Sequence, residues 1–292
     1  MLLRDVINTD TRKTLKAMNM HGSGRDAAGS ATAAPTVPCL AAVLFLLAVP
    51  AGAEVAETSL PAACTANRVA PFEDRRLAGP DMRGDFTDAQ GHLFAQADLV
   101  PLDTTAQPAM PARDLRFHDI AGRPDRWNRR TGLLLDAGDG SWLALDEVAS
   151  GRAGVLPARL SPACLAPLLA AEETARRAGR GAWADHRVPK ASEPDTITRL
   201  TGRFSLVEGR VLGVGETRST LYLNFGYRWR DDFTVTISAS SREEFAAAGL
   251  DVAALEGAAI RVRGIVQTRD GPLIKVSHPA QIERLDKDGM RR

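Results

Sequence analysis

The strongest constraint on the fold is a regular alternation of apolar and polar residues over residues 221–230. Apolar side chains occupy one set of alternate positions, Leu221, Leu223, Phe225, Tyr227 and Trp229, and the other set includes Tyr222, Asn224, Arg228 and Arg230. Successive side chains of a β-strand point to opposite faces, so this pattern predicts a strand with one buried face. Residues 233–237 and 260–263 repeat the alternation, which predicts a β-rich domain.

The elements around this strand follow the order of a small barrel. Strands are also predicted over residues 207–214 and 273–276, and a helix is predicted over 241–255, which starts with a capping serine and two glutamates. Three strands, one helix and two strands is the element order of an OB-fold, a five-stranded, partly open barrel.

The boundary before this barrel is marked by a change in composition. Residues 188–200 contain prolines, serine and threonines with no apolar period, which is typical of a linker. We therefore expect one domain over 54–187, the linker, an OB-like domain over 201–286 and a short tail, 287–292.

An unbroken run of eleven apolar residues, 39–49, lies near the start of the chain. It is too short for a membrane-spanning helix, which needs about 20 residues. Basic residues precede the run, and the small residues up to Ala53 fit a cleavage site. Residues 1–53 are thus predicted to be a signal peptide cleaved after Ala53, with Met18 or Met20 as alternative start sites. The protein is then expected to be periplasmic or secreted, without a membrane span after cleavage; an uncleaved anchor is the alternative.

Two cysteines, Cys64 and Cys164, remain after the leader is removed. Export would place them in an oxidising compartment, so a disulfide between them is expected, with two buried thiols as the alternative. The five histidines are scattered without paired spacing, and none is assigned to a metal or to catalysis. A composition of 44% apolar and 25% charged residues indicates a globular chain, and the net charge of +1 indicates no general affinity for polyanions.

The domain over 54–187 mixes strands with helices. Strands are predicted over 93–100, 131–135 and 141–144, the last two joined in a hairpin, and a short helix is predicted over 146–149. A long helix is expected over 162–180, capped by Ser161 and supported by pairs of Glu172 with Arg176 and Glu173 with Arg177.

Several segments of this domain together resemble the thermonuclease (staphylococcal-nuclease-like) family. They are Asp125-Arg-Trp-Asn-Arg-Arg-Thr-Gly-Leu-Leu-Leu, Asp139-Gly-Ser-Trp142, Val148-Ala-Ser-Gly151-Arg-Ala, Leu168-Leu-Ala-Ala-Glu172-Glu-Thr-Ala-Arg176 and Gly181-Ala-Trp183. The resemblance covers about residues 120–185 in the right order and spacing. It implies an OB-type barrel with a C-terminal helix, so the expected fold is mainly β with α, as two tandem OB-type five-stranded barrels.

The resemblance also implies a chemistry, metal-assisted cleavage of phosphodiesters. That reaction uses a carboxylate-bound divalent cation, calcium here, with a carboxylate base and arginines that neutralise phosphoryl charge. Arg129 matches the arginine of the family's polar turn, and Asp103 falls at the general-base position. Ala95 and Val100 stand where the family has a second arginine and a metal-binding carboxylate, so whether the protein is an enzyme is left open by its sequence.

Binding without cleavage is the competing interpretation. Arg126 and Arg130 lie beside Arg129, and Tyr222, Arg228 and Arg230 would share the outer face of the best predicted strand. Aromatic and basic side chains on an OB barrel can hold single-stranded nucleic acid, so weak, salt-sensitive binding of DNA or RNA is expected. The alternative is a non-enzymatic envelope binding or scaffold module with an oligosaccharide or protein partner.

Overall fold

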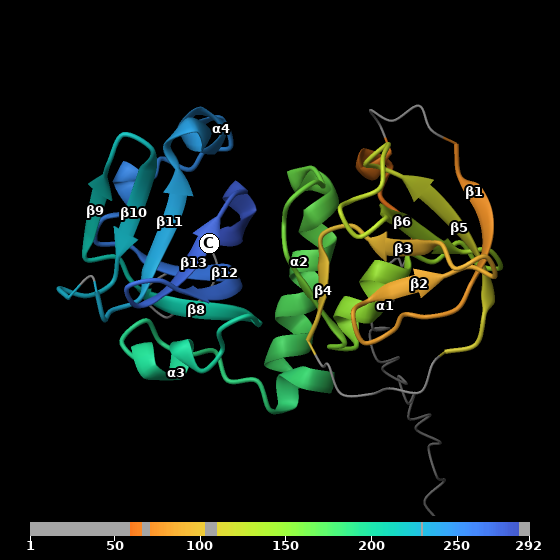
Figure 1. Ribbon diagram of the computed structural model, residues 1–292, viewed down its shortest axis with the longest axis horizontal. Helices are drawn as coiled ribbons and strands as arrows, with labels where there is room; N and C mark the ends of the chain where they lie inside the picture. Colours follow the sequence, from red (N-terminus) through yellow and green to blue (C-terminus); the bar gives the residue numbers. More distant parts are fainter. Residues whose placement is uncertain (1–58, 66–70, 103–109, 229, 286–292) are drawn as a thin grey trace, which may run out of the picture. The chain divides into compact units, whose positions relative to one another are not determined.

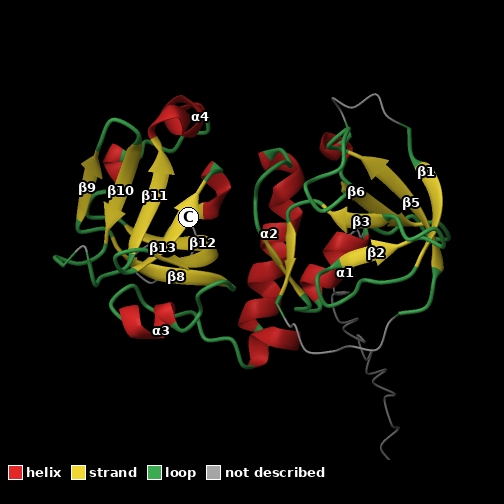
Figure 2. Cartoon of the chain, in the orientation of Figure 1, coloured by secondary structure: helices red, strands yellow, loops and turns green. Residues whose placement is uncertain are grey.

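The chain folds mainly into β-strands, with fewer helices (Figures 1 and 2). The computed structural model describes residues 59–65, 71–102, 110–228 and 230–285. These residues belong to one compact unit, Val55–Arg292. The predicted signal peptide and the predicted tail lie outside the described residues. Within the part of the chain that is described, no helix is long and apolar enough to cross a bilayer.

The N-terminal half contains a curled five-stranded sheet. Its strands are β1 (Glu73–Leu77), β2 (Asp85–Thr87), β3 (Leu93–Gln96), β5 (Arg113–Asp119) and β6 (Arg129–Asp136). They lie in the order β1-β5-β6-β3-β2, and only β3 and β6 run parallel. A bridge from Ala78 to Thr87 connects the end of β1 to β2. The two edges of the sheet therefore meet, and the sheet has a barrel-like curl.

Helices and a small second sheet pack on this half. The helices are α1 (Leu143–Ala149) and α2 (Pro162–Arg177), and the small sheet pairs β4 (Leu99–Pro101) with β7 (Ala153–Val155). The Ser161 hydroxyl accepts the Cys164 N–H at 3.3 Å, and Pro162 occupies the first turn, so α2 begins where its capping residues predict. It ends before Gly179, which has a left-handed φ of +60°.

The C-terminal half contains a second curled sheet and short helices. Its elements are α3 (Pro194–Thr198), β8 (Phe204–Arg210), β9 (Gly213–Glu216), β10 (Thr220–Asn224), β11 (Thr234–Ser238), α4 (Arg242–Ala247), β12 (Ala259–Thr268), β13 (Pro272–Val276) and β14 (Ile282–Arg284). The order is β14-β12-β13-β11-β10-β9, and β8 pairs with the first part of β12. The two halves have separate apolar cores, and a smaller cluster that includes Leu102, Trp183 and Phe204 joins them.

Several predicted elements differ from the structure in length or type. The strand expected over 93–100 is broken into β3 and β4, because Asp98 between them has a left-handed φ of +58°. The strand expected over 141–144 is wrong beyond two isolated bridges, Ser141 with Ser59 and Trp142 with Leu135. Helix α1 begins at Leu143 instead, because the apolar residues 144, 145 and 148 are buried on one side of a helix.

In the C-terminal half the best predicted strand is shorter than its alternation suggests. β10 ends at Asn224, and the Asp232 carboxylate accepts the Arg228 N–H at 2.6 Å to close the following loop. Tyr227, expected on the buried face, is 92% exposed. The helix expected over 241–255 ends at Ala247, ahead of Gly249 with a φ of +79°.

The segment expected to be a linker, 188–200, contains helix α3. Ile197 on this helix is completely buried in the core of the C-terminal half, where Leu200 packs against the same cluster. The segment is therefore part of a folded core, although its composition is polar.

The predicted disulfide is present between Cys64 and Cys164, whose Cα atoms are 4.9 Å apart. It connects the start of the described chain to the first turn of α2 and closes a loop of 100 residues. Both cysteines are buried in the same apolar cluster.

Replacing both cysteines by alanine is expected to lower the free energy of unfolding by about 2–5 kcal/mol, since the unfolded chain loses a long cross-link. Urea denaturation of the double variant and of the reduced wild-type chain measures this loss, and the two should agree. An unchanged urea midpoint in both would contradict the prediction.

The polar face of β12 is buried, although its alternation suggested contact with water. The side chains of Arg261 and Arg263 are 4% and 3% exposed. Arg263 pairs with Glu172 of α2 and Glu283 of β14. Arg261 contacts Glu208 at 2.8 Å and Glu173 at 3.1 Å. These pairs join α2 to the second sheet.

The expected pairs along α2 are thereby changed. Glu173 contacts Arg177 at 2.7 Å as predicted, but Arg176 pairs with Glu173 and not with Glu172. Glu172 is buried and accepts the Val155 N–H at 2.7 Å in addition to its pair with Arg263.

Arg263→Met is expected to destabilise the fold by about 3–5 kcal/mol, because buried Glu172 loses its cation and buried Glu283 keeps only Arg261. Thermal and urea unfolding measure the loss. Arg242→Met, which breaks an exposed pair with Glu216, is the matched control and should change stability little. Equal effects of the two substitutions would show that burial of the Arg263 pairs carries no special weight.

Candidate functional site

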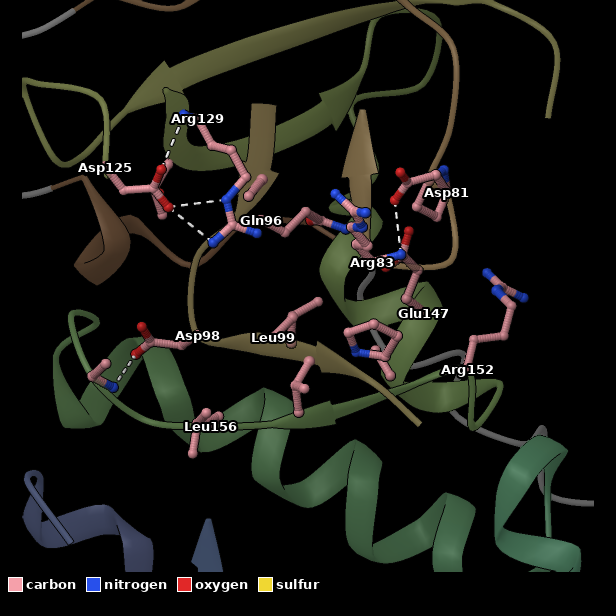
Figure 3. Close-up of a pocket in the computed structure, with 18 of the residues that line it drawn as sticks. Asp81, Arg83, Gln96, Asp98, Leu99, Asp125, Arg129, Glu147, Arg152 and Leu156 are labelled. Atoms are coloured by element: carbon pink, nitrogen blue, oxygen red, sulfur yellow. Dashed lines mark hydrogen bonds and ion pairs between the residues drawn. The ribbon is translucent and has the colours of Figure 1, made fainter. Parts of the chain in front are cut away.

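A cavity of about 350 Å³ lies beside the curled N-terminal sheet (Figure 3). Its walls come from the β1–β2 connection, from β3 and β4, from the turn before β6, and from the chain that runs from α1 past β7. Ligand pockets commonly begin at about 300 Å³, so the cavity has room for one small ligand.

Arg129, the predicted turn arginine, lies in this cavity between two carboxylates. Its Nη1 is 3.0 Å from Asp85 Oδ1, and its Nε and Nη2 are each 2.9 Å from Asp125 Oδ2. Asp125 also accepts the backbone N–H groups of Trp127 and Arg129, and Asn128 takes a left-handed φ of +61° to complete the turn. The guanidinium is thus held in one orientation by a short local loop and one distant strand.

Asp85 is the carboxylate that the sequence did not indicate as a partner of Arg129. It begins β2, and its side chain is only 5% exposed. Burial raises the pKa of Asp85, and the adjacent Arg129 guanidinium opposes that rise. The pair is therefore a partly buried ion pair, in which Asp85 and Asp125 neutralise the charge of Arg129.

Trp127 lies at the rim of the cavity with 56% of its surface exposed. The guanidinium carbon of Arg126 is 3.9 Å from its ring centroid, and that of Arg129 is 4.9 Å from it. Cation–π contacts of this length hold the indole in place while leaving much of it accessible.

A further carboxyl group, Glu147 of α1, lines the cavity beside Gln96 of β3 (Figure 3). Glu147 is 7% exposed, and burial raises its pKa to about 7, while Arg152 and Arg113 act in the opposite direction. Gln96 is 6% exposed and also favours the ionised form of Glu147. Neither amide atom of Gln96 makes a hydrogen bond of good geometry within the described residues.

Asp98 fixes another wall of the cavity. Its carboxylate accepts the backbone N–H groups of Ala158, Arg159 and Leu160 at 2.9–3.0 Å. Its own carbonyl accepts the Leu156 N–H at 2.7 Å. Asp98 therefore has a structural role, because it pins the loop after β7 to the end of β3.

The side chains around the cavity do not fit the divalent cation that the family resemblance implies. Among the described residues, no group of three histidine, cysteine, aspartate or glutamate side chains could hold a metal ion. Asp85 and Asp125 are already occupied by Arg129. No step through a bound cation is derived from this arrangement.

The positions that the resemblance singled out do reach the cavity. Ala95 and Val100 both line it, and Ala95 is paired in register with Asp85 across β2 and β3. A methyl and an isopropyl group thus occupy the places where an arginine and a metal-binding carboxylate were expected. Asp103, the expected general base, lies outside the described residues.

The two arginines beside Arg129 have different surroundings. Arg126 is exposed and stacks on Trp127. Arg130 is absent from the cavity walls, because successive strand residues face opposite sides. It is held by Glu73 at 2.8 Å and by Asp119 at 3.0 Å.

A second hollow, of about 520 Å³, lies on the C-terminal half along β10, β11 and β13. Tyr222 lines it, together with Asn224, Thr234, Thr236 and Lys275. Arg228 and Arg230 lie in the loop after β10 and not on its outer face with Tyr222. The hollow is lined mainly by hydroxyl and amide groups.

Sequence reasoning missed the contact of Asp85 with Arg129, and it missed Gln96 and Glu147 as residues of the cavity. Asp85 follows Gly84 in a segment without periodicity, and Glu147 belongs to a helix that was predicted only in part. The available signal was the loss of the family's polar residues at Ala95 and Val100. This loss indicates the part of the chain that lines the cavity, but it does not indicate which other polar residues line it.

No protein-family model matches the chain, and no curated protein matches it.

Glu147→Gln is expected to stabilise the protein relative to wild type at pH 8 and to change little at pH 4. The pKa of Glu147 is about 7 in the folded protein and near 4.5 in the unfolded chain. Between these two pH values the native state holds a proton on Glu147 that the unfolded state has lost. The free energy of unfolding of the wild type therefore falls as pH rises through this window and stays lower above it. The difference at pH 8 should be about 3 kcal/mol. Urea unfolding at both pH values measures it, and an equal effect of the substitution at pH 4 and pH 8 would contradict the raised pKa.

Proposed function

We propose that the protein is a thermonuclease-like chain of two tandem OB-type barrels that binds single-stranded nucleic acid at the Trp127 cavity without metal-assisted cleavage. The observation that carries this proposal is the exposed indole of Trp127, which two guanidinium groups contact at the mouth of a cavity.

Stacking is the interaction that this arrangement favours. A base that stacks on an accessible aromatic ring gains about 1–3 kcal/mol, and neighbouring arginines add attraction to the ring faces and to the backbone phosphates. Arg126 is exposed and can contact a phosphate without losing an internal ion pair.

The pairing of Arg129 inside the cavity favours binding of nucleic acid over its cleavage. Arg129 is neutralised by Asp85 and Asp125, whereas phosphoryl transfer needs an arginine and a metal free to take up developing charge. Ala95 and Val100 supply neither group. The same guanidinium that would assist cleavage instead orients Trp127.

The proposal includes export from the cytoplasm. The disulfide between Cys64 and Cys164 supports it, because such bonds persist in oxidising compartments.

Trp127→Ala is expected to weaken binding of a fluorescent single-stranded oligonucleotide by about 5- to 150-fold, the loss of one stacked base. Fluorescence anisotropy with the full chain measures binding at 50 and 200 mM salt. Trp127→Phe should restore most of the affinity. Tyr227→Ala, which removes an exposed aromatic in the C-terminal half, is the matched control and should bind like wild type.

The same oligonucleotide should stay intact with calcium, with magnesium and with chelator. Metal-dependent cleavage would overturn the non-hydrolytic part of the proposal. Absence of salt-sensitive binding would overturn the nucleic-acid part.

The hollow along β10, β11 and β13 favours a second candidate, an envelope module that binds a neutral oligosaccharide. Tyr222 offers a ring for stacking against a sugar, while Asn224, Thr234 and Thr236 offer neutral hydrogen-bonding groups. Calorimetric titration with chitotetraose tests it, with Tyr222→Ala as the variant that should lose binding. No heat of binding to the wild-type chain would contradict this candidate for that sugar.

A further inference from the structure

The inner wall of the Trp127 cavity carries polar groups that stacking at the rim does not use. Gln96 and Glu147 come from β3 and α1, and in Figure 3 the side chain of Gln96 points toward Glu147. Both side chains line the cavity and both are more than nine-tenths buried.

The two amide atoms of Gln96 are buried and make no hydrogen bond of good geometry among the described residues, although the side chain lies close enough to Glu147 to favour its ionised form. A buried amide whose hydrogen bonds are poorly aligned is energetically unfavourable. Because Gln96 lines a cavity, a bound molecule can satisfy this amide when the side chain turns toward it.

We propose that Gln96 and Glu147 form a specificity pocket for the hydrogen-bonding edge of guanine. The inference rests on the proposed nucleic-acid function and adds the identity of the base.

The chemistry of the two groups selects that edge. An ionised Glu147 carboxylate accepts two hydrogen bonds side by side, and guanine presents two adjacent donors, N1–H and the 2-amino group. The Gln96 NH2 group can donate to guanine O6 beside them. Adenine presents one donor next to an acceptor, and uracil presents one donor between two acceptors. Neither base has two adjacent donors that could pair with both oxygens of one carboxylate.

The charges around Glu147 allow its ionised form to be reached on binding. Arg113 of β5 and Arg152 of the turn after α1 favour that form, while Asp146 on the same helix opposes it. Arg83 and Asp81 of the β1–β2 connection also line the cavity. In the free protein burial outweighs the arginines and raises the pKa of Glu147 to about 7. Two N–H donors from guanine would shift the balance to the carboxylate.

Affinity for guanine should therefore rise with pH. Guanine binds the ionised carboxylate, so its affinity is proportional to the ionised fraction of Glu147. With a pKa of about 7, this fraction is about tenfold higher at pH 8 than at pH 6. The ratio of affinities for guanosine and adenosine 5′-monophosphates should rise by the same factor. The ratio of the two nucleotides removes the common effect of phosphate ionisation.

The test is calorimetric titration of the full chain with guanosine, inosine and adenosine 5′-monophosphates at pH 6, 7 and 8. Guanosine monophosphate should bind most tightly at pH 8, and inosine monophosphate, which lacks the 2-amino donor, about 5- to 150-fold more weakly. Because the inosine comparison uses the wild-type chain, it does not depend on the folding of any variant.

Glu147→Gln should abolish both the preference and its pH dependence, because an amide turns one donor toward guanine N1–H. Glu244→Gln, an exposed glutamate of α4, is the matched control and should keep both.

The outcomes separate the two proposals. Equal binding of all three nucleotides that is lost in Trp127→Ala would overturn the guanine pocket and leave the stacking site standing. A guanine preference that persists in Glu147→Gln would overturn the assigned residues. Failure of every nucleotide and oligonucleotide to bind would overturn both proposals.

Discussion

The buried ion pairs of β12 connect the parts of this structure that matter for the cavity. Arg263 joins Glu172 and Glu283, and Arg261 joins Glu173, Glu208 and Glu283. Arg261, Arg263, Glu172 and Glu283 are almost completely removed from water and depend on their partners, since an unpaired buried charge would cost several kcal/mol. Helix α2 is held between this network and the disulfide at its first turn.

Helix α2 also supports the cavity, indirectly, through β7. Glu172 accepts the Val155 N–H of β7, and β7 pairs with β4, which supplies part of the cavity wall. Asp98 then ties the loop after β7 to the end of β3. The position of the cavity wall opposite Arg129 is therefore fixed by backbone N–H groups that donate to the buried carboxylates of Glu172 and Asp98.

Within the cavity, Arg129 is paired with Asp85 and Asp125, Trp127 has an accessible ring, and Gln96 has a buried amide. Arg129 serves to orient Trp127, Asp85 neutralises it, and Ala95 adds no charge across the strand pair.

Much of the fold could be predicted from local patterns. The strands β6, β10 and β11, the cap of α2 and the Cys64–Cys164 pair followed from periodicity, capping residues and cysteine number, because each of these depends on neighbouring residues or on a simple pairing. Tertiary contacts decided the rest. Alternation records that one face of β12 is polar, but only the packing of α2 against it determines that Arg261 and Arg263 are buried. In the same way, the meeting of Asp85 with Arg129 depends on the curl of the sheet, and that of Gln96 with Glu147 depends on the packing of α1 against the sheet. These residues are far apart in sequence and carry no local signal of their contact.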